Sequence, residues 1–388
     1  MEITFNTSDI WLLSALSIFL IIQLIYYWLF LSKPYFHLRK IRKGKISFPH
    51  SSPAVSVIIY ARNKSKNLEA FLPSVLEQNY PEFEVIVVYD DISDNSENVL
   101  KRLKAQYPSL YYTYIPQGTK GLSRKKLGLT LGIKAAKFDV LLFSDADSHP
   151  VGESWIKNMS RHLSERKTIV LGFCALEKHS GLGYKFADYD YFFMNLRMAA
   201  SALLKFSYNA NGRNLLYKKE YFDRRKGYSK YRRLQAGEDD LFIDEIATKE
   251  NMAVELSPGS IISVSRDDFF DWKSAKINQA TTRHFYKKMP LLFWRFESWS
   301  RFFFLLLFFV CIFHDFWNWI LPFSAIIAFI IRLFSQLFVI NKTSACMKLR
   351  KYYFLFPFFD AAQPVVNTYF YIRKLFRGKI NYSWKYEK

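Results

Sequence analysis

The chain has 388 residues, of which 50% are hydrophobic and 19% aromatic, and this composition excludes a disordered chain. Its 14 glycines and 13 prolines are too few for a fibrous protein. Lysine and arginine number 55 against 34 acidic residues, and the resulting net charge of +21 favours anionic partners such as nucleic acid, acidic lipid or phosphorylated ligands.

The first predicted element is an apolar segment, Ile10 to Leu31, which has 22 residues and no charge. At about 1.5 Å per residue a helix of this length reaches about 33 Å, which is enough to cross the hydrocarbon core of a bilayer. A cleaved signal peptide is disfavoured because only acidic charges precede the segment. Lysines and arginines follow it. We therefore predict a transmembrane helix over 1–32, a basic juxtamembrane linker over 33–52 and a cytoplasmic position for the chain beyond, at the plasma (inner) membrane.

Strands and helices then alternate through a water-soluble region, 53–294. Apolar runs predict strands at 54–60, 83–89, 111–115 and 140–143, and the segments between them predict helices at 67–78, 96–107 and 123–136. This spacing predicts an α/β domain with a mostly parallel, Rossmann-like sheet. In such a sheet ligands bind outside the carboxyl ends of the strands.

A second apolar block, 302–340, is too long for one span and is interrupted at His314-Asp315. Basic residues flank it on both sides, which predicts a transmembrane hairpin over 295–341, with helices at about 300–313 and 317–340. Arg332 falls within the second helix, and we expect it to snorkel towards the cytoplasmic face.

The C-terminal segment, 342–388, is basic and amphipathic. Its apolar part, 352–372, contains Asp360, Gln363 and Asn367 and has basic residues on both flanks. A further span would place one basic flank outside. We therefore expect an interfacial or re-entrant segment here.

The clearest chemical signal is Asp145-Ala146-Asp147, which comes directly after the strand at 140–143 and Ser144. Two carboxylates at a strand exit can hold one divalent cation, and their hard oxygen atoms suit Mg²⁺ or Mn²⁺. Such a metal can bind the diphosphate of a nucleotide-sugar and neutralise charge on the leaving group. The alternative is a solvated turn, but the acids at other strand ends favour the metal site.

Two more acidic clusters accompany this one. Asp90 and Asp91 follow a strand, where they can accept hydrogen bonds from a base or a ribose, or else cap the next helix. Glu238, Asp239 and Asp240 precede a predicted helix at 241–248. Their mutual repulsion can raise one pKa towards that of a general base, although acids also stand at helix N-termini because the helix dipole favours them there.

Taken in order, these signatures resemble the membrane-anchored family-two glycosyltransferases, whose catalytic domain has the GT-A fold. The resemblance covers about residues 53–290 and rests on six sequences: Val55–Ile59 with Ala61–Asn63, Gln78–Pro81, Asp90-Asp91, Lys125-Lys126, Ser144–Asp147 and Glu238–Asp240. It implies an inverting hexosyltransferase that uses a nucleoside-diphosphate sugar. Either Asp239 or Asp240 would be the catalytic base, and Asp239 is favoured.

The resemblance also implies roles for the remaining positions. The donor would be bound by Ala61, Asn63, Asp90, Asp91, Lys125, Lys126, Asp145 and Arg283. The metal would be held by Asp145 and Asp147, and the acceptor side would be formed by Gly212, Arg213, Asn214 and Glu238.

One departure concerns the length of the product. Processive synthases carry a Gln-x-x-Arg-Trp signature, whereas here Gln279 lies one position too far from Arg283 and His284 replaces the tryptophan. We therefore predict single addition to a membrane-associated acceptor, such as a glycolipid or polyprenyl-linked glycan of a cell-envelope pathway. A processive polysaccharide synthase and an inactive membrane scaffold remain the alternatives. No nucleic-acid-binding motif accompanies the basic residues, so we expect membrane lipid, and no nucleic acid, as their partner.

Overall fold

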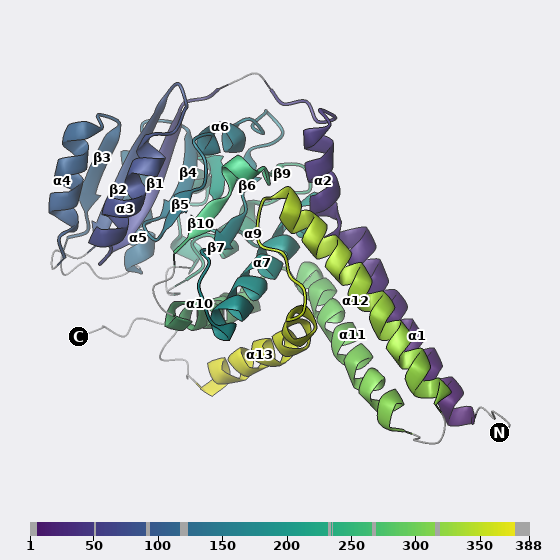
Figure 1. The fold of residues 1–388 in the computed structure, drawn as a ribbon. Helices are drawn as coiled ribbons and strands as arrows, with labels where there is room; N and C mark the ends of the chain where they lie inside the picture. The colour runs from purple at the N-terminus through teal and green to yellow at the C-terminus, as the bar shows by residue number, and fades with distance from the viewer. Residues whose placement is uncertain are drawn as a thin grey trace. The chain divides into compact units, whose positions relative to one another are not determined.

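The computed structural model describes residues 6–49, 52–90, 94–116, 123–231, 234, 236–265, 269–314 and 319–376 (Figure 1). The chain divides into two compact units. One comprises Met1–Arg39 and Lys288–Tyr369, and the other comprises Lys40–Lys287 and Phe370–Lys388.

The second unit is built on a seven-stranded sheet with the order β3-β2-β1-β4-β8-β6-β9. The first four strands in this order are parallel, and β8 runs antiparallel to both of its neighbours. A smaller sheet has the order β5-β10-β7. The strands are β1 (Val55–Arg62), β2 (Phe83–Asp90), β3 (Leu110–Tyr114), β4 (Val140–Asp145), β5 (Ser148–Pro150), β6 (Ile169–Leu171), β7 (Cys174–Leu176), β8 (Leu215–Lys218), β9 (Met252–Val254) and β10 (Ile262–Val264).

Helices accompany this sheet along the chain (Figure 1). They are α3 (Ser65–Leu76), α4 (Ser96–Gln106), α5 (Arg124–Ala135), α6 (Trp155–Ser160), α7 (Leu182–Leu203), α8 (Glu220–Arg224), α9 (Asp240–Ile246) and α10 (Phe269–Thr282), with short 3₁₀ helices η2 (Ser229–Tyr231), η3 (Pro258–Ser260) and η4 (Arg283–Phe285).

Alternation along β1 explains why helices pack on both sides of the sheet. Val57 and Ile59 belong to a buried apolar cluster that includes side chains of α3 and α4. Ile58 points the other way, towards α5, where a Cβ on Gly132 would lie 2.7 Å from Ile58 Cγ2. Only glycine therefore allows α5 to approach the sheet this closely. The predicted α/β architecture with a mostly parallel sheet is confirmed, and both β2 and β4 end in an aspartate.

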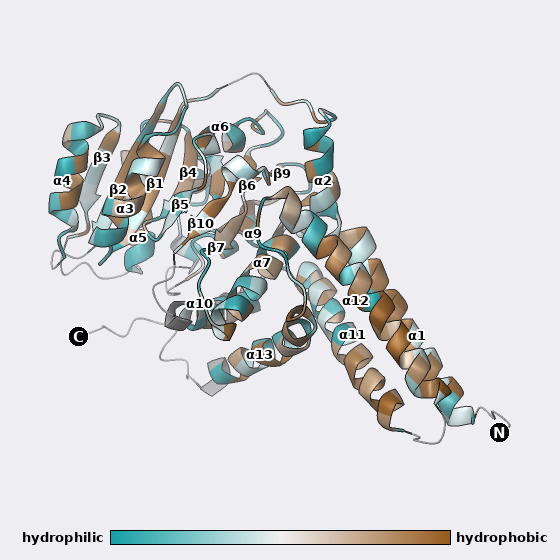
Figure 2. Ribbon diagram, viewed as in Figure 1, coloured by the Kyte–Doolittle hydropathy of each residue, from teal (hydrophilic) through white to brown (hydrophobic). Residues whose placement is uncertain are grey.

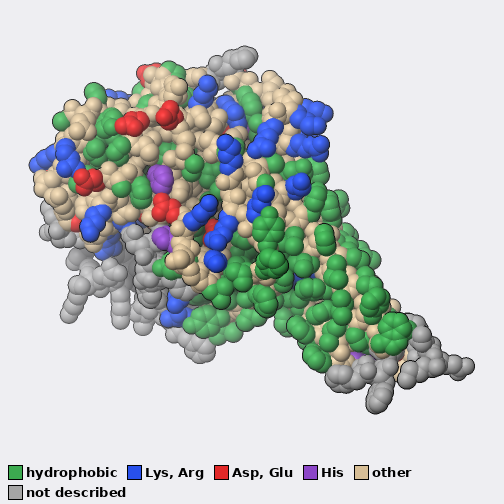
Figure 3. Space-filling view, in the orientation of Figure 1, with side chains coloured by type: hydrophobic (Ala, Val, Ile, Leu, Met, Phe, Trp, Pro, Cys, Tyr) green, Lys and Arg blue, Asp and Glu red, His purple; other side chains and the backbone are tan. Residues whose placement is uncertain are grey.

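The first unit consists of long helices. They are α1 (Thr7–Ile25), the π-helical segment η1 (Tyr26–Leu31), α11 (Lys288–Phe313), α12 (Ile320–Cys346) and α13 (Phe356–Phe376), while α2 (Lys33–Arg42) continues from α1 in the sequence. By length and composition three described helices can cross a membrane: Thr7–Arg42, Lys288–Phe313 and Ile320–Cys346. Figures 2 and 3 show that α1, α11 and α12 are largely hydrophobic and carry apolar side chains on their surface. The chain is therefore associated with a membrane.

A buried polar network lies among these helices. The guanidinium groups of Arg301 and Arg332 form ion pairs with Asp360 at 3.1 and 2.7 Å, and Arg301 also pairs with Glu297 at 2.5 Å. Gln23 of α1 accepts from Arg332 at 3.1 Å. These charges offset one another, and each of the four ionisable side chains is at most 2% exposed.

The network corrects two expectations. Arg332 does not snorkel to a surface, because Asp360 and Gln23 bind it inside the helix bundle. The first helix of the hairpin begins at Lys288 rather than near residue 300, since the paired Glu297 and Arg301 are buried and do not end the helix. Residues 356–376 form a helix, and its interfacial or re-entrant placement stays a prediction.

Candidate active site

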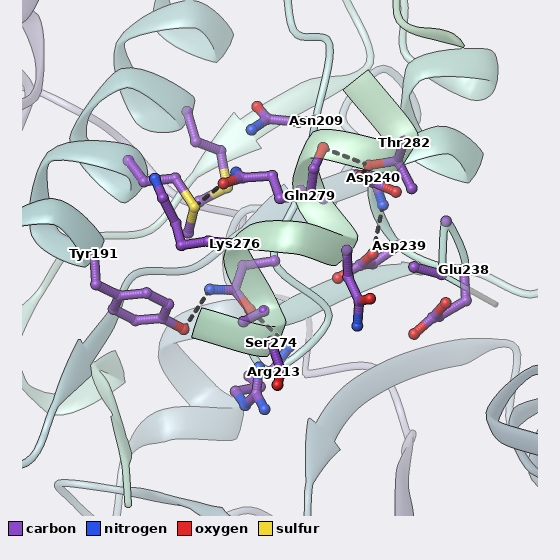
Figure 4. A pocket seen from close by; sticks show the side chains of 18 of the residues that line it. Tyr191, Asn209, Arg213, Glu238, Asp239, Asp240, Ser274, Lys276, Gln279 and Thr282 are labelled. Atoms are coloured by element: carbon purple, nitrogen blue, oxygen red, sulfur yellow. Dashed lines mark hydrogen bonds between the residues drawn. The ribbon is translucent and has the colours of Figure 1, made fainter. Parts of the chain in front are cut away.

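A cavity of about 420 Å³ lies in the second unit, beyond the carboxyl end of β4. Its walls come from Asp147, the segment 209–213, the segment 236–240 and one face each of α7 and α10. Figure 4 shows side chains from these separate segments converging on one space. The cavity therefore occupies the position where an α/β sheet binds its ligands.

The Asp145-Ala146-Asp147 motif forms the turn between β4 and β5. Asp145 is the last residue of β4, and Ser148 closes the turn by donating from Oγ to the Asp145 carbonyl at 2.8 Å. Arg213 binds both oxygens of Asp147, with distances of 2.9 Å from Nε to Oδ1 and 2.8 Å from Nη2 to Oδ2. Lys125 Nζ binds Asp145 Oδ2 at 2.9 Å.

Ion pairing shifts the pKa of Asp147 and of Lys125. Burial alone would raise the pKa of Asp147, but the charge of Arg213 outweighs burial and lowers that pKa. Burial likewise opposes the charge on Lys125, but Asp145 and Glu238 outweigh it and raise the pKa of Lys125. Both carboxylates of the motif are thus surrounded by positive charge.

The position of one Arg213 nitrogen indicates whether the two carboxylates are close enough to share a divalent metal. Arg213 Nη2 lies 2.8 Å from Asp147 Oδ2 and 3.5 Å from Asp145 Oδ2. A single positively charged group can therefore contact both carboxylates, and carboxylate oxygens are the ligands that Mg²⁺ and Mn²⁺ prefer. The donor set fits a divalent ion, with the guanidinium standing where that ion would bind. Among the described residues no group of three or more histidines, cysteines or acids is arranged to hold a metal by itself.

The second acidic motif lies at the start of α9. Asp239 is the N-cap residue and accepts from the Asp240 N–H at 2.8 Å through Oδ1. Its other oxygen, Oδ2, accepts from the Gly212 N–H at 2.7 Å. A Cβ on Gly212 would lie 3.0 Å from that oxygen, so glycine is what permits the contact. Two backbone donors thus orient a carboxylate that lines the cavity.

Asp240 is placed differently from Asp239. Its Oδ2 accepts hydroxyl hydrogen bonds from Thr282 and Tyr286, each at 2.5 Å, and its side chain is buried. Burial and the neighbouring charge of Asp239 raise the pKa of Asp240 to about 7, although the two hydroxyls lower it. Asp240 therefore ties α9 to the end of α10.

Glu238 connects the two acidic motifs. Its Oε1 lies 3.4 Å from Lys125 Nζ, the same ammonium that binds Asp145. Burial raises the pKa of Glu238, against the effect of Lys125. Its Oε2 is buried and has no hydrogen-bond partner within the described part of the chain.

The sequence comparisons agree with this geometry. Residues 56–225 match the sequence model of the family described as Glycosyl transferase family 2. This chain carries a family-two glycosyltransferase domain. The match begins in β1 and ends directly after α8, so it contains the Asp145-Ala146-Asp147 turn and the Gly212-Arg213 segment.

Curated relatives match a shorter stretch. The chain is 28% identical over 133 residues to poly-beta-1,6-N-acetyl-D-glucosamine synthase of Staphylococcus epidermidis, which is 34% of this chain and 30% of that protein. It is 24% identical over 135 residues to the GalNAc(5)-diNAcBac-PP-undecaprenol beta-1,3-glucosyltransferase of Campylobacter jejuni, which is 35% of this chain and 42% of that one. The chain thus spans less than half the length of either relative.

A solved structure extends the likeness to the fold. Mannosyltransferase PcManGT of Pyrobaculum calidifontis, solved with GDP-Man and Mn²⁺, superposes with a TM-score of 0.52 at 15% identity. The superposition covers 94% of this chain and 100% of the mannosyltransferase. The family-two domain accordingly has the GT-A fold.

The residues predicted to bind the donor base and ribose lie at the ends of β1 and β2. Asp90 is buried and accepts from Tyr60 Oη at 2.7 Å and from Arg124 Nε at 2.6 Å. Ala61 is buried within β1, and Asn63 follows that strand with a positive φ of 50°. Asp91 lies outside the described residues. Their roles in this family-two domain stay predictions.

Three more of the predicted site residues do not line this cavity. Lys126 is fully buried, and its ammonium donates to the carbonyl oxygens of Tyr231, Leu234 and Ala236. Asn214 is 1% exposed; its side-chain amide donates to the carbonyls of Phe173 and Ser260 and accepts from the Trp155 indole. Arg283 lies in η4 and does not line the cavity.

The structure also adds residues to the family-two site that the motifs did not reveal. On α7 the cavity is lined by Asp190, Tyr191, Met194 and Met198, and on α10 by Trp272, Ser274, Ala275, Lys276, Asn278, Gln279 and Thr282. Lys276 pairs with Asp190 at 2.9 Å, which links the two helices. The helical spacing of polar and apolar residues is the signal in the sequence that could have pointed to these residues. It does not single them out, because any buried helix face shows the same spacing.

Proposed function

We propose that the protein is an inverting glycosyltransferase that transfers a sugar from a nucleoside-diphosphate sugar to a membrane-associated acceptor at the cytoplasmic face. The observation that carries this proposal is the position of Asp239. Its carboxylate is fixed by two backbone N–H groups on the wall of the same cavity that Asp147 lines. The proposed base and one carboxylate of the proposed metal site therefore line the same cavity.

The proposed reaction is a single displacement. Asp239 takes the proton from an acceptor hydroxyl, and the oxygen attacks the anomeric carbon of the donor sugar. The bond between that carbon and the diphosphate oxygen breaks, so the nucleoside diphosphate leaves with both bonding electrons. Attack from the face opposite the leaving group inverts the anomeric configuration.

Asp239 is the better candidate for the base than Asp240. The Asp240 carboxylate is occupied by Thr282 and Tyr286 and is buried. Within the described residues Asp239 accepts one hydrogen bond at each oxygen, which leaves lone pairs available to a substrate hydroxyl.

Charge on the leaving group is met by cations around the Asp145-Ala146-Asp147 turn. A bound Mg²⁺ or Mn²⁺ held by Asp145 and Asp147 would neutralise the negative charge that develops on the leaving diphosphate. Lys125 lies beside Asp145 and can donate to a phosphate oxygen. Lys126 is assigned a structural part instead, because backbone carbonyls bind its ammonium.

Membrane helices and charge support the proposed acceptor and orientation. The basic segment after α1 and the basic flanks of the α11–α12 pair favour the cytoplasmic side by the positive-inside rule. The Campylobacter relative is named for an undecaprenyl-diphosphate-linked acceptor, which supports a glycolipid or polyprenyl-linked glycan for this chain.

The test is a donor screen on the full chain purified in detergent with Mn²⁺. Release of nucleoside diphosphate is measured from a panel of nucleotide-sugars, with and without total lipid extract. We expect release from one donor, stimulated by lipid and abolished in Asp147→Ala. Asp239→Asn should lower kcat by about 10²–10⁴-fold while nucleotide binding is retained, and Asp223→Asn, at an exposed acid outside the cavity, serves as the matched control.

Two results would contradict the proposal. If no donor is turned over and no nucleotide binds, the chain is better explained as an inactive membrane scaffold. If the product is a ladder of oligomers, the single addition favoured by His284 in place of tryptophan is wrong, and the chain is a processive synthase. The Staphylococcus relative, named as a polysaccharide synthase, makes that second result worth measuring directly.

A further inference from the structure

Arg213 occupies the position between the two carboxylates that the proposed function gives to a metal. Its guanidinium binds Asp147 through two nitrogens, at 2.8 and 2.9 Å, and approaches Asp145 at 3.5 Å. Such a paired geometry uses both oxygens of Asp147 and is among the stronger hydrogen-bonded arrangements that a protein makes.

A guanidinium and a divalent ion cannot use these oxygens in the same way at the same time. Mg²⁺ binds carboxylate oxygen at about 2.0–2.1 Å, which places it well inside the space that Arg213 Nη2 fills. Two positive groups at that separation would also repel each other strongly. The metal can therefore enter only when the Arg213 side chain turns away.

We propose that Arg213 is a built-in counter-cation of the Asp145-Ala146-Asp147 site, which the divalent metal displaces when the nucleotide-sugar binds. This inference rests on the proposed function. The free enzyme then has low affinity for the metal alone, and metal binding becomes dependent on the phosphate oxygens that the donor contributes. Arg213 is a gate for the metal and not a permanent part of its binding site.

The displaced side chain has a place to go. Arg213 lines the cavity, and its side chain is 23% exposed, so rotation towards the open space of the cavity is not blocked by the protein core. A guanidinium freed there matches the paired oxygens of a diphosphate. The residue that neutralises Asp147 in the free enzyme would neutralise the donor in the complex.

Displacement of the Arg213 side chain is also expected to affect the proposed base, Asp239. Gly212, directly before Arg213, donates its N–H to Asp239 Oδ2 at 2.7 Å. Two consecutive residues thus hold the metal-binding carboxylate and the base. A movement of Arg213 that accompanies metal binding occurs next to the group that orients Asp239, so donor binding and orientation of the base are coupled through one short segment.

The test measures metal affinity rather than turnover. Mn²⁺ is titrated into the full chain in detergent, without nucleotide, and free Mn²⁺ is followed by electron paramagnetic resonance. We expect Arg213→Gln to bind Mn²⁺ at least about tenfold more tightly than the unmodified chain, a difference of about 1.4 kcal/mol. Arg213→Lys, which keeps the charge but loses the paired geometry, should lie between them. Addition of nucleoside diphosphate should tighten Mn²⁺ binding far more in the unmodified chain than in Arg213→Gln.

The chain offers a matched control. Arg161 also binds a carboxylate through two nitrogens, which both reach Glu255 Oε2, at 3.0 and 2.6 Å. Its side chain is 22% exposed and does not line the cavity. Arg161→Gln should leave Mn²⁺ affinity unchanged. Asp147→Asn should lose Mn²⁺ binding, and near-ultraviolet circular dichroism establishes that each variant is folded.

Three results separate the possibilities. Equal Mn²⁺ affinity in Arg213→Gln and the unmodified chain, with binding still lost in Asp147→Asn, overturns the gate and leaves the proposed function intact. Mn²⁺ binding that survives Asp147→Asn overturns the gate because the metal binds elsewhere. Tighter binding in Arg213→Gln, together with no turnover of any donor, supports the gate and contradicts the proposed function.

Discussion

The buried network around Asp360 makes a quantitative prediction about stability. In Asp360→Ala the side chains of Arg301 and Arg332 lose their shared partner, while Glu297 remains paired with Arg301. One buried positive charge is then left without compensation. The perturbation is confined to the first unit and leaves the cavity of the second unit unchanged in sequence.

The contacts set the magnitude. Asp360 forms an ion pair with each arginine, at 3.1 and 2.7 Å, and the contact with Arg332 is also a hydrogen bond. Two charge-assisted contacts of about 1.5–3 kcal/mol each predict a loss of about 3–6 kcal/mol. Breaking a buried ion pair by removing one partner costs about 3–5 kcal/mol, which agrees. Because about 1 kcal/mol shifts Tm by about 2–4 °C in chains of about 150–250 residues and by less in longer ones, we expect Tm to fall by about 5–10 °C.

The assay is thermal unfolding of the full chain in detergent, followed by fluorescence-detected gel filtration. Val365→Ala, on the same helix at a position that is 63% exposed, is the control and should change Tm little. The double variant Arg332→Met with Asp360→Ala removes one charge of each sign and should recover part of the lost stability. The reasoning is refuted if Asp360→Ala behaves like Val365→Ala, or if the double variant is as unstable as the sum of its parts.

Three further predictions concern the second unit. Because the pKa of Asp240 is raised to about 7, its charged form destabilises the fold at high pH. The Tm of Asp240→Asn relative to the unmodified chain should therefore increase as pH rises from about 5 to 8, and a constant difference would contradict this. Lys126→Met leaves three carbonyls without their shared donor and should cost about 3 kcal/mol or more in unfolding free energy, whereas Lys125→Met should mainly lower kcat. Tm and donor kinetics separate the two effects, and the reverse pattern would restore Lys126 to the donor site. Gly212→Ala places a Cβ 3.0 Å from Asp239 Oδ2 and should lower kcat by about 10–100-fold with unchanged Mn²⁺ affinity, and full activity would show that Asp239 is not held there.

The sequence located the acidic residues of the site but not their partners. Asp145 and Asp147 follow an apolar strand, and Asp239 precedes a helix, so local patterns were enough to single them out. Arg213 was predicted on the acceptor side, yet it binds Asp147 across 66 residues of sequence. Lys126 was paired with Lys125 because they are adjacent, but successive residues of a helix point in different directions. Only one of the two ammonium groups therefore reaches the carboxylates.

The α/β architecture and the apolar membrane helices were determined by the sequence itself. Both depend on local periodicity and on the length of apolar runs, which are properties of neighbouring residues. Tertiary structure alone decided which polar groups meet. Gln23 and Arg332 are 309 residues apart, and their contact exists only because the helices pack together. The cavity wall formed by α7 and α10 is likewise a product of tertiary packing. Buried polar groups must find hydrogen-bond partners within the fold, and these partners come from distant parts of the sequence.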